Sequence, residues 1–199
     1  DKLFVAERHG KIWAFSRDPK SDERQLVLDI GHTIYGLAFH PNFDQNGYVF
    51  VTHVLDAANP GPDGSRLSRF QVTDKKTLAA DPKSEKVFLI WPSGGHNGGC
   101  IKFAPDGLLH LVTGDGSGIA DELETGQRLD DLLGAMLRID VDSGDPYGIP
   151  AGNMPGGGGG ERAVAAGDAD GVGARAAARG VHLDARRVSS LAEPPVTDC

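Results

Sequence analysis

The chain contains the sequence GGCIKFAPDGLLHLVT at residues 98–113, and its pattern matches GLAFHPNFDQNGYVFVT at residues 36–52. The match aligns Phe39 with Phe103. A second match joins LSRFQV, from residue 67, to MLRIDV, from residue 136, at nearly the same separation along the chain. Two matches at nearly one offset predict a repeated unit of several strands, as in the blades of a β-propeller. The alternative is a β-sandwich that contains two similar hairpins.

Within residues 1–150 the hydrophobic periodicity is that of strands, so we expect an all-β fold. The run at residues 48–54 is almost continuously apolar, as expected of a strand that is covered on both faces. One short helix is expected around residues 127–133, where leucines recur on one face. The other predicted strands are 67–72, 137–141, and a hairpin of 3–6 with 11–15 around Arg8-His9-Gly10.

Composition and charge exclude several classes of protein. The 199 residues are 39% hydrophobic and 24% charged, and a formal net charge of −8 disfavours nucleic acid as the main partner. No apolar run approaches the roughly 20 residues that a membrane-spanning helix needs. The two cysteines, Cys100 and Cys199, have no metal-ligand spacing and indicate no disulfide framework. The first residues are already strand-like, so we expect any signal peptide to lie upstream of Asp1.

The segment 151–199 differs sharply in composition from the rest of the chain. All 13 aromatic residues fall within residues 1–150, and the segment contains no Phe, Trp, Tyr, Ile or Lys. It offers too little bulky apolar surface to offset the entropy of ordering it, so we expect a disordered tail. Two origins stay open. The tail is either a natural low-complexity segment or a frame-shifted reading of a GC-rich gene, because Gly, Ala and Arg have GC-rich codons.

Two glycine-rich loops border the strands of the second repeat. His96 lies in Gly-Gly-His-Asn-Gly-Gly, and Asp115 lies in Gly-Asp-Gly. Glycine allows positive φ and close backbone approach, so both sequences are typical of tight loops at strand ends. A histidine that titrates near neutral pH, oriented by a carboxylate, suits general-base chemistry. The competing interpretation is a loop histidine without a catalytic role.

Metal sites are weaker interpretations of the same region. The spacing of His96 and His110 fits no common zinc pattern, and His110 in a leucine-rich strand is typical of a packed polar residue. Asp140, Asp142 and Asp145 could suit calcium, but they lack the spacing of an EF-hand loop and indicate a solvated turn. We therefore predict no metal ligands in this chain.

The motifs together resemble the glucose/sorbosone dehydrogenase family. The resemblance spans roughly residues 1–150. It rests on GLAFHPNF from residue 36, HNGGCIKFAPDG from residue 96, TGDG from residue 113 and LGAMLRID from residue 133. That family is similar to the soluble sugar dehydrogenases that depend on pyrroloquinoline quinone (PQQ), which are six-bladed β-propellers with the quinone on top of the ring. About two blades fit in this length, so the resemblance implies a partial six-bladed propeller.

The resemblance implies roles for two residues. His96 falls on the family's catalytic histidine, the base that takes a proton from the sugar hydroxyl while hydride passes to PQQ. Asp115 falls on the aspartate that partners this histidine, which implies that the two loops meet at the top face. The glutamine that typically precedes the Gly-Leu-Ala-Phe strand is not evident, and His32 or Tyr35 lies near its place. The family's quinone-binding cations and calcium ligands lie mainly in later blades, so calcium ligands are expected outside this chain and no cofactor-binding residue is assigned within it.

We therefore expect a PQQ-dependent oxidoreductase that oxidises a sugar or alcohol hydroxyl by hydride transfer, of which this chain is an incomplete and inactive fragment. The resemblance also implies a periplasmic or secreted location. The alternative, from another functional class, is a non-catalytic propeller that recognises carbohydrate or protein. The identity of the sugar, the electron acceptor and the oligomeric state stay open.

Overall fold

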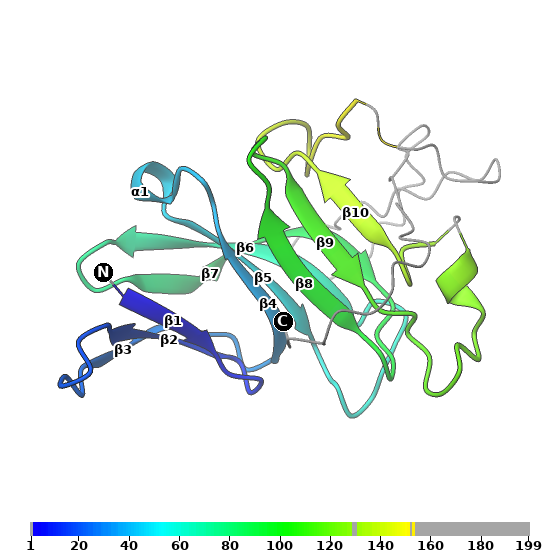
Figure 1. Cartoon of the computed structure of the whole chain (residues 1–199), viewed down its shortest axis with the longest axis horizontal. Coiled ribbons are helices and arrows are strands. Elements are labelled where there is room, and N and C mark those ends of the chain that lie inside the picture. The colour runs from blue at the N-terminus through cyan, green and yellow to red at the C-terminus, as the bar shows by residue number, and fades with distance from the viewer. Residues whose placement is uncertain (1, 129–130, 152, 154–199) are drawn as a thin grey trace.

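The computed structural model describes residues 2–128, 131–151 and 153, and the strands of these residues form three antiparallel sheets (Figure 1). The strands are β1 (Lys2–Ala6), β2 (Lys11–Ser16), β3 (Arg24–Asp29), β4 (Thr33–Phe39), β5 (Tyr48–Val54), β6 (Ser65–Asp74), β7 (Ala79–Trp91), β8 (Gly98–Phe103), β9 (Leu109–Thr113) and β10 (Met136–Ile139). Two short helices, α1 (Phe43–Asn46) and η1 (Thr125–Gln127), lie between them. The first sheet has the order β1-β2-β3, the second β4-β5-β6-β7, and the third β10-β9-β8.

The expected all-β fold is confirmed, and the sequence repeat corresponds to the second and third sheets. In chain order, β4, β5 and β6 correspond to β8, β9 and β10. The second sheet is a complete four-stranded unit, whereas the third contains three strands within the described residues. The first sheet precedes the repeat and adds a further sheet to the two units that the repeat predicts (Figure 1).

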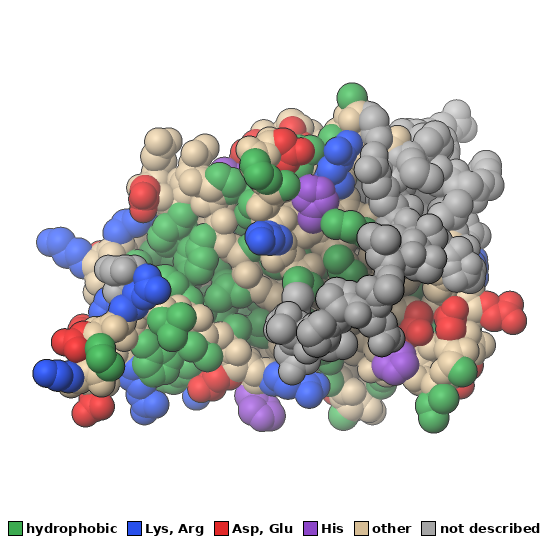
Figure 2. All heavy atoms as spheres, viewed as in Figure 1, with side chains coloured by type: hydrophobic (Ala, Val, Ile, Leu, Met, Phe, Trp, Pro, Cys, Tyr) green, Lys and Arg blue, Asp and Glu red, His purple; other side chains and the backbone are tan. Residues whose placement is uncertain are grey.

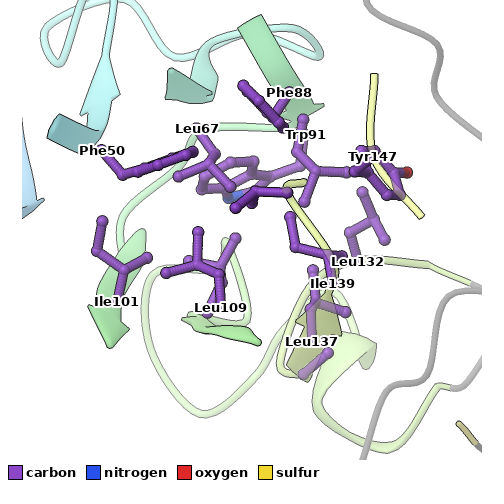
Figure 3. Packing of buried hydrophobic residues seen from close by; sticks show 14 of the residues in the cluster. Phe50, Leu67, Phe88, Trp91, Ile101, Leu109, Leu132, Leu137, Ile139 and Tyr147 are labelled. Atoms are coloured by element: carbon purple, nitrogen blue, oxygen red, sulfur yellow. The ribbon is translucent and has the colours of Figure 1, made fainter. Parts of the chain in front are cut away.

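The second sheet is covered on both faces, as the continuous apolar run of β5 predicts. Val49 and Val51 belong to a buried cluster that includes Ile12 of the first sheet. Phe50 points the other way, because successive side chains of a strand lie on opposite faces. It joins a second cluster with Leu109 and other side chains of the third sheet (Figure 3). The three sheets therefore pack face against face, with one hydrophobic core on each side of the second sheet.

The correspondence between the two repeat units extends to their irregularities. The register of β4 against β5 shifts at Tyr35, and the register of β8 against β9 shifts at Gly99, the residue that the repeat aligns with Tyr35. Strands β4 and β8 approach closely at this point, since a Cβ added to Gly36 would collide with the carbonyl oxygen of Gly99. The Thr52 hydroxyl donates a hydrogen bond to the same oxygen. The packing of one unit against the next therefore requires glycine at position 36.

The prediction of a helix around residues 127–133 was wrong for the described residues after Gln127, which is the last residue of η1. Leu132 and Leu133 lie in a bend and a turn, and both are buried in the core between the second and third sheets. Backbone groups of this segment bond to a side chain of β9. The Thr113 hydroxyl donates to the carbonyl of Leu132 and accepts from the N–H of Ala135. The leucine spacing thus reflects burial of a turn by the strands beside it.

The outward face of the first sheet is apolar. Leu3, Val5 and Leu26 are 56%, 40% and 41% exposed. Figure 2 shows hydrophobic side chains gathered over the region where β1, β2 and β3 lie in Figure 1. Apolar faces of this kind ordinarily pack against another element.

Two further expectations concern the rest of the chain. The segment 151–199, for which composition predicts a disordered tail, lies outside the described residues apart from Ala151 and Asn153. Among the residues that the structure describes, no helix has the length and apolarity needed to cross a membrane.

Candidate functional site

The loops that carry His96 and Asp115 run side by side and extend the β8–β9 pair. The N–H of Gly116 donates to the carbonyl of His96, and the N–H of His96 donates to the carbonyl of Ser117, both at 3.0 Å. These bonds continue the antiparallel ladder beyond the ends of the two strands. The two loop ends therefore meet, although the two residues are 19 positions apart in the sequence.

The glycines of these loops are needed because the two backbones touch. A Cβ added to Gly94 would collide with the carbonyl oxygen of Gly116, and a Cβ added to Gly114 would collide with that of His96. Gly98 has φ +63°, a conformation that favours glycine over every other residue. The sequence predicts close backbone approach at these glycines. In the structure, the two loops approach each other.

The side chains of His96 and Asp115 form a hydrogen bond, with 3.1 Å between Nδ1 and Oδ1. Burial alone would raise the pKa of Asp115, but hydrogen bonds from the N–H of Ser117 and from His96 hold this pKa below its usual value. The ionised carboxylate can only accept, so the imidazole donates from Nδ1, and the neutral ring in this tautomer has its lone pair on Nε2. The His96 side chain is 57% exposed and that of Asp115 is 22% exposed, so the pair is open to a small molecule.

Residues 118–126, which we call the acidic loop, contain three carboxylates and lie next to Asp115. The Thr125 hydroxyl donates to the backbone carbonyl of Asp115, which ties the loop to the pair. Two aliphatic side chains of the loop, Ile119 and Leu123, are 84% and 54% exposed. Figure 2 shows hydrophobic side chains protruding at the lower right, close to acidic ones, where the chain after β9 lies in Figure 1.

His32 occupies the position in the second sheet that His96 occupies in the third. Each histidine lies three residues before the irregular residue of its strand, so the repeat aligns the two. The Nδ1 of His32 donates to the backbone carbonyl of Leu55 at 3.0 Å. Leu55 corresponds to Asp115. The strand pairing aligns β5 with β9, and the two residues follow these strands at the same distance from the aligned pairs. Of these two units, only the third sheet combines the histidine with a carboxylate at this place, and alignment of the repeats could have revealed this difference.

A buried polar cluster of the second sheet was not singled out from the sequence. The ring of His53, 1% exposed, stacks on that of His32 with centroids 5.5 Å apart. Its Nε2 lies 3.1 Å from Ser68 Oγ and 3.3 Å from Glu85 Oε1, and Ser68 donates to Glu85 at 2.6 Å. Burial lowers the pKa of His53, so its ring is neutral near pH 7. The hydrogen bond from His53 outweighs burial and, with that from Ser68, lowers the pKa of Glu85 to about 2.

Replacing Glu85 by glutamine is expected to lower the free energy of unfolding by about 1–3 kcal/mol near neutral pH. The folded pKa lies below the ordinary value of 4.5. The ionised group therefore contributes stability that is present above that value and is lost as the pH falls toward about 2. Urea unfolding of the two proteins should show a difference that shrinks between about pH 6 and about pH 3. The exposed Glu7→Gln is the matched control, with an expected change within about 0.5 kcal/mol. A Glu85→Gln difference that stays constant with pH would contradict this account.

The remaining sequence candidates have other roles in the structure. His110 lies within β9, as a strand residue. The Asp140 carboxylate accepts from the N–H of Asp142 at 3.0 Å and from the Ser143 hydroxyl at 2.8 Å, which is the pattern of a turn. In the part of the chain that the structure describes, no group of three or more His, Cys, Asp or Glu side chains is arranged to hold a metal ion.

Comparison with known sequences finds relatives that are much longer than this chain. Hedgehog-interacting protein of Mus musculus is 30% identical over 172 residues, which cover 76% of this chain and 25% of the relative. HIPL2 protein of Arabidopsis thaliana is 29% identical over 192 residues, which cover 71% of this chain and 28% of the relative. The chain thus spans about a quarter of the length of these relatives.

Comparison with solved structures bears on the fold, and comparison with family models bears on the family. The PQQ-bound aldose sugar dehydrogenase from Streptomyces coelicolor has a TM-score of 0.60 at 23% identity, and the similarity covers 78% of this chain and 45% of that one. The apo-form soluble aldose sugar dehydrogenase from Escherichia coli has a TM-score of 0.56 at 18% identity, covering 76% and 43%. These likenesses support a partial β-propeller. The model of the glucose/sorbosone dehydrogenase family matches residues 1–164. The chain therefore belongs to the glucose/sorbosone dehydrogenase family.

Proposed function

We propose that this chain is part of a PQQ-dependent sugar or aldose dehydrogenase in which His96 and Asp115 remove the proton of the substrate hydroxyl. The observation that carries the proposal is the Nδ1–Oδ1 hydrogen bond of 3.1 Å between loops at the ends of β8 and β9. Family membership supports the reaction class, and a PQQ-bound solved neighbour of the same fold supports the choice of cofactor.

Proton removal follows from the chemistry of the pair. Asp115 accepts the hydrogen bond from Nδ1 and so fixes the tautomer that leaves Nε2 as a base. As the substrate carbon is oxidised, Nε2 takes the proton of its hydroxyl, and the imidazolium that forms is stabilised by the adjacent carboxylate. The exposure of His96 allows a small sugar or alcohol to reach the ring. PQQ, when bound, supplies the two-electron acceptor.

The described residues around the pair do not by themselves fit the cofactor, because PQQ carries several carboxylates and needs cations. Arg8 lies over the ring of Tyr35, with 5.8 Å from Cζ to the ring centroid. Arg128 is paired with Asp131, with 3.3 Å between Nε and Oδ2. The acidic loop adds negative charge on the side of Asp115. We therefore place the quinone-binding cations in other parts of the longer protein, in line with the 45% share of the quinone-bound neighbour that this chain matches.

An assay of the full-length protein tests the proposed function. The protein would be loaded with PQQ and offered a panel of aldoses and simple alcohols with an artificial dye as electron acceptor. We expect dye reduction that requires both PQQ and an aldose, and no turnover by the 199-residue chain alone. A full-length, folded protein that shows no PQQ-dependent turnover with any member of the panel would exclude this function.

We also propose a periplasmic or secreted location. The proposal rests on the family resemblance of the sequence. Fractionation of the source cells, followed by detection of the full-length protein, would check it. Recovery in the cytoplasmic fraction alone would contradict it.

A second candidate function is protein recognition without turnover, and the acidic loop is the observation that favours it. Ile119 and Leu123 are held in solvent on an ordered, hydrogen-bonded loop, where exposed aliphatic side chains often mark binding surfaces. The three carboxylates of the loop favour a partner that is both basic and apolar. A relative, Hedgehog-interacting protein, carries a name that describes a binding protein.

For this second function, the double variant Ile119→Asp with Leu123→Asp is expected to weaken binding of basic aliphatic peptides by about tenfold or more. The fold should survive, because both side chains are exposed. A peptide array of graded charge and apolarity, probed with the full-length protein at low and high salt, measures the effect. The control is Ala57→Asp, which adds a carboxylate at an exposed position in the loop after β5. Equal binding of all peptides by both proteins would reject the acidic loop as a recognition surface.

A further inference from the structure

The side chain of Asn97, next to the proposed base, uses both ends of its amide. Its Oδ1 accepts from the N–H of Gly94 at 2.8 Å, and its Nδ2 donates to the carbonyl of Gly94 at 2.9 Å. The same Nδ2 donates to the hydroxyl of Tyr35 at 3.3 Å. Asn97 is 7% exposed, so these bonds are largely shielded from water. The side chain thus closes the short loop that presents His96.

Tyr35 belongs to a different sheet and has a fixed position there. It is the irregular residue of β4, and it lies against β8, where a Cβ added to Gly99 would come within 2.8 Å of the Tyr35 Cβ. The ring is also covered by the guanidinium of Arg8, from the turn of the first sheet. The bond from Asn97 to Tyr35 therefore connects the His96 loop to the neighbouring blade.

We propose that Asn97 is the positioning residue of the His96–Asp115 pair, anchored across the blade boundary by the Tyr35 hydroxyl. The catalytic meaning of this role rests on the proposed function, whereas the geometry stands independently of it. Asn97 acts through the loop backbone and through His96, not on the substrate.

Two features of the loop explain why such a clamp is needed. Glycine pairs flank the dipeptide of His96 and Asn97, and glycine loses more conformational freedom on ordering than any other residue. The His96 side chain is more than half exposed, so burial does little to hold its ring. An amide also suits the position better than any other side chain of its size, because Gly94 offers a donor and an acceptor at once.

The second sheet provides an internal control. Thr33 is the residue that the repeat aligns with Asn97; it follows His32 and begins β4 directly. His32 donates to the Leu55 carbonyl and so has the same Nδ1–H tautomer as His96. Any effect of Asn97 on the imidazole should therefore appear at His96 and not at His32.

Nitrogen-15 NMR of the histidine rings in the full-length protein tests the proposal directly. In the wild type, His96 should show the Nδ1–H tautomer. In Asn97→Ala it should shift toward the Nε2–H form that predominates for imidazoles in water, while the His32 ring keeps its signals. The pKa of Asp115, followed by its carboxyl carbon shift, should rise toward the usual value as the bond from His96 is lost. Tyr35→Phe should move both readouts in the same direction by a smaller amount.

Kinetics add a readout that depends on the proposed function. If the full-length protein oxidises aldoses, Asn97→Ala should lower kcat by about 10-fold to 100-fold with little change in KM, because it misplaces the base rather than the substrate. Asn97→Asp keeps the acceptor for the N–H of Gly94 but loses the donor to the Gly94 carbonyl and to Tyr35, so it should not restore the activity of the wild type.

The outcomes separate the positioning role from the proposed function. An unchanged His96 tautomer and an unchanged Asp115 pKa in folded Asn97→Ala would overturn the positioning role, whatever the turnover. If the alanine variant does not fold, Tyr35→Phe decides, since it removes one hydroxyl: unchanged readouts there overturn the anchor. A wild-type protein without turnover would reject the proposed function and leave the NMR result valid.

Discussion

If the proposed function is correct, the His96→Ala variant of the full-length protein is expected to turn over an aldose about 10²-fold to 10⁴-fold more slowly than the wild type, with PQQ binding largely unchanged. The reason is the loss of the proposed base. His96 has its Nδ1 bonded to a carboxylate, at 3.1 Å, on an exposed loop. Steady-state kcat with saturating aldose and PQQ, measured beside a thermal melt, gives the comparison.

Two further variants show whether the loss is chemical. Asp115→Asn should cost less than His96→Ala if Asp115 mainly orients the imidazole, because an amide oxygen can still accept from Nδ1. It should cost more if the carboxylate also stabilises the charged ring. His110→Ala is the control, since His110 lies within β9 and has no part in the pair. A His96→Ala enzyme that melts normally and retains near-normal kcat would remove His96 from the mechanism.

The parts of the fold that could be predicted from the sequence are those where burial imposes a simple period. The continuous run of β5 is buried on both faces because sheets pack against both sides of it. The match of Phe39 with Phe103 reflects two strands at equivalent places in successive units. The glycines around His96 and Asp115 also predicted close backbone contact, because only a residue without a side chain fits there. The structure shows that this contact is between the two loops.

The parts that could not be predicted depend on contacts between units. The spacing of the leucines near residue 132 suggests a helix, but Thr113 of β9 takes up the backbone groups that a helix would use. The link from Asn97 to Tyr35 joins residues 62 positions apart and carries no local pattern. The cluster of His53 and Glu85 is likewise assembled from separate strands. A sequence reveals side-chain periodicity within a strand, whereas these bonds exist because one strand lies beside another.

The Phe50→Ala variant is expected to lower the free energy of unfolding by about 3–5 kcal/mol, a large part of the total stability of an ordinary domain. Phe50 is 1% exposed and lies in the core between the second and third sheets (Figure 3). Its ring meets those of Phe88 and Phe103 at centroid distances of 5.4 Å, with interplanar angles of 66° and 73°. Removing it leaves a cavity and also forfeits these edge-to-face contacts.

This loss should reach the candidate site, because the core around Phe50 is what docks the third sheet, and with it His96 and Asp115, onto the second. We therefore expect Phe50→Ala to lower the urea midpoint and, in the same samples, to weaken the His96–Asp115 bond as followed by the imidazole nitrogen shifts. Phe50→Leu keeps most of the volume and should lose less than half as much stability. Leu3→Ala, at a side chain 56% exposed on the first sheet, should change stability by less than about 0.5 kcal/mol. If Phe50→Ala were no more costly than Leu3→Ala, the face-to-face packing of the second and third sheets would be refuted. If instead it destabilised the protein while the imidazole signals of the folded state stayed unchanged, the site would be held by its two loops and by the anchor to Tyr35, without a contribution from the core around Phe50.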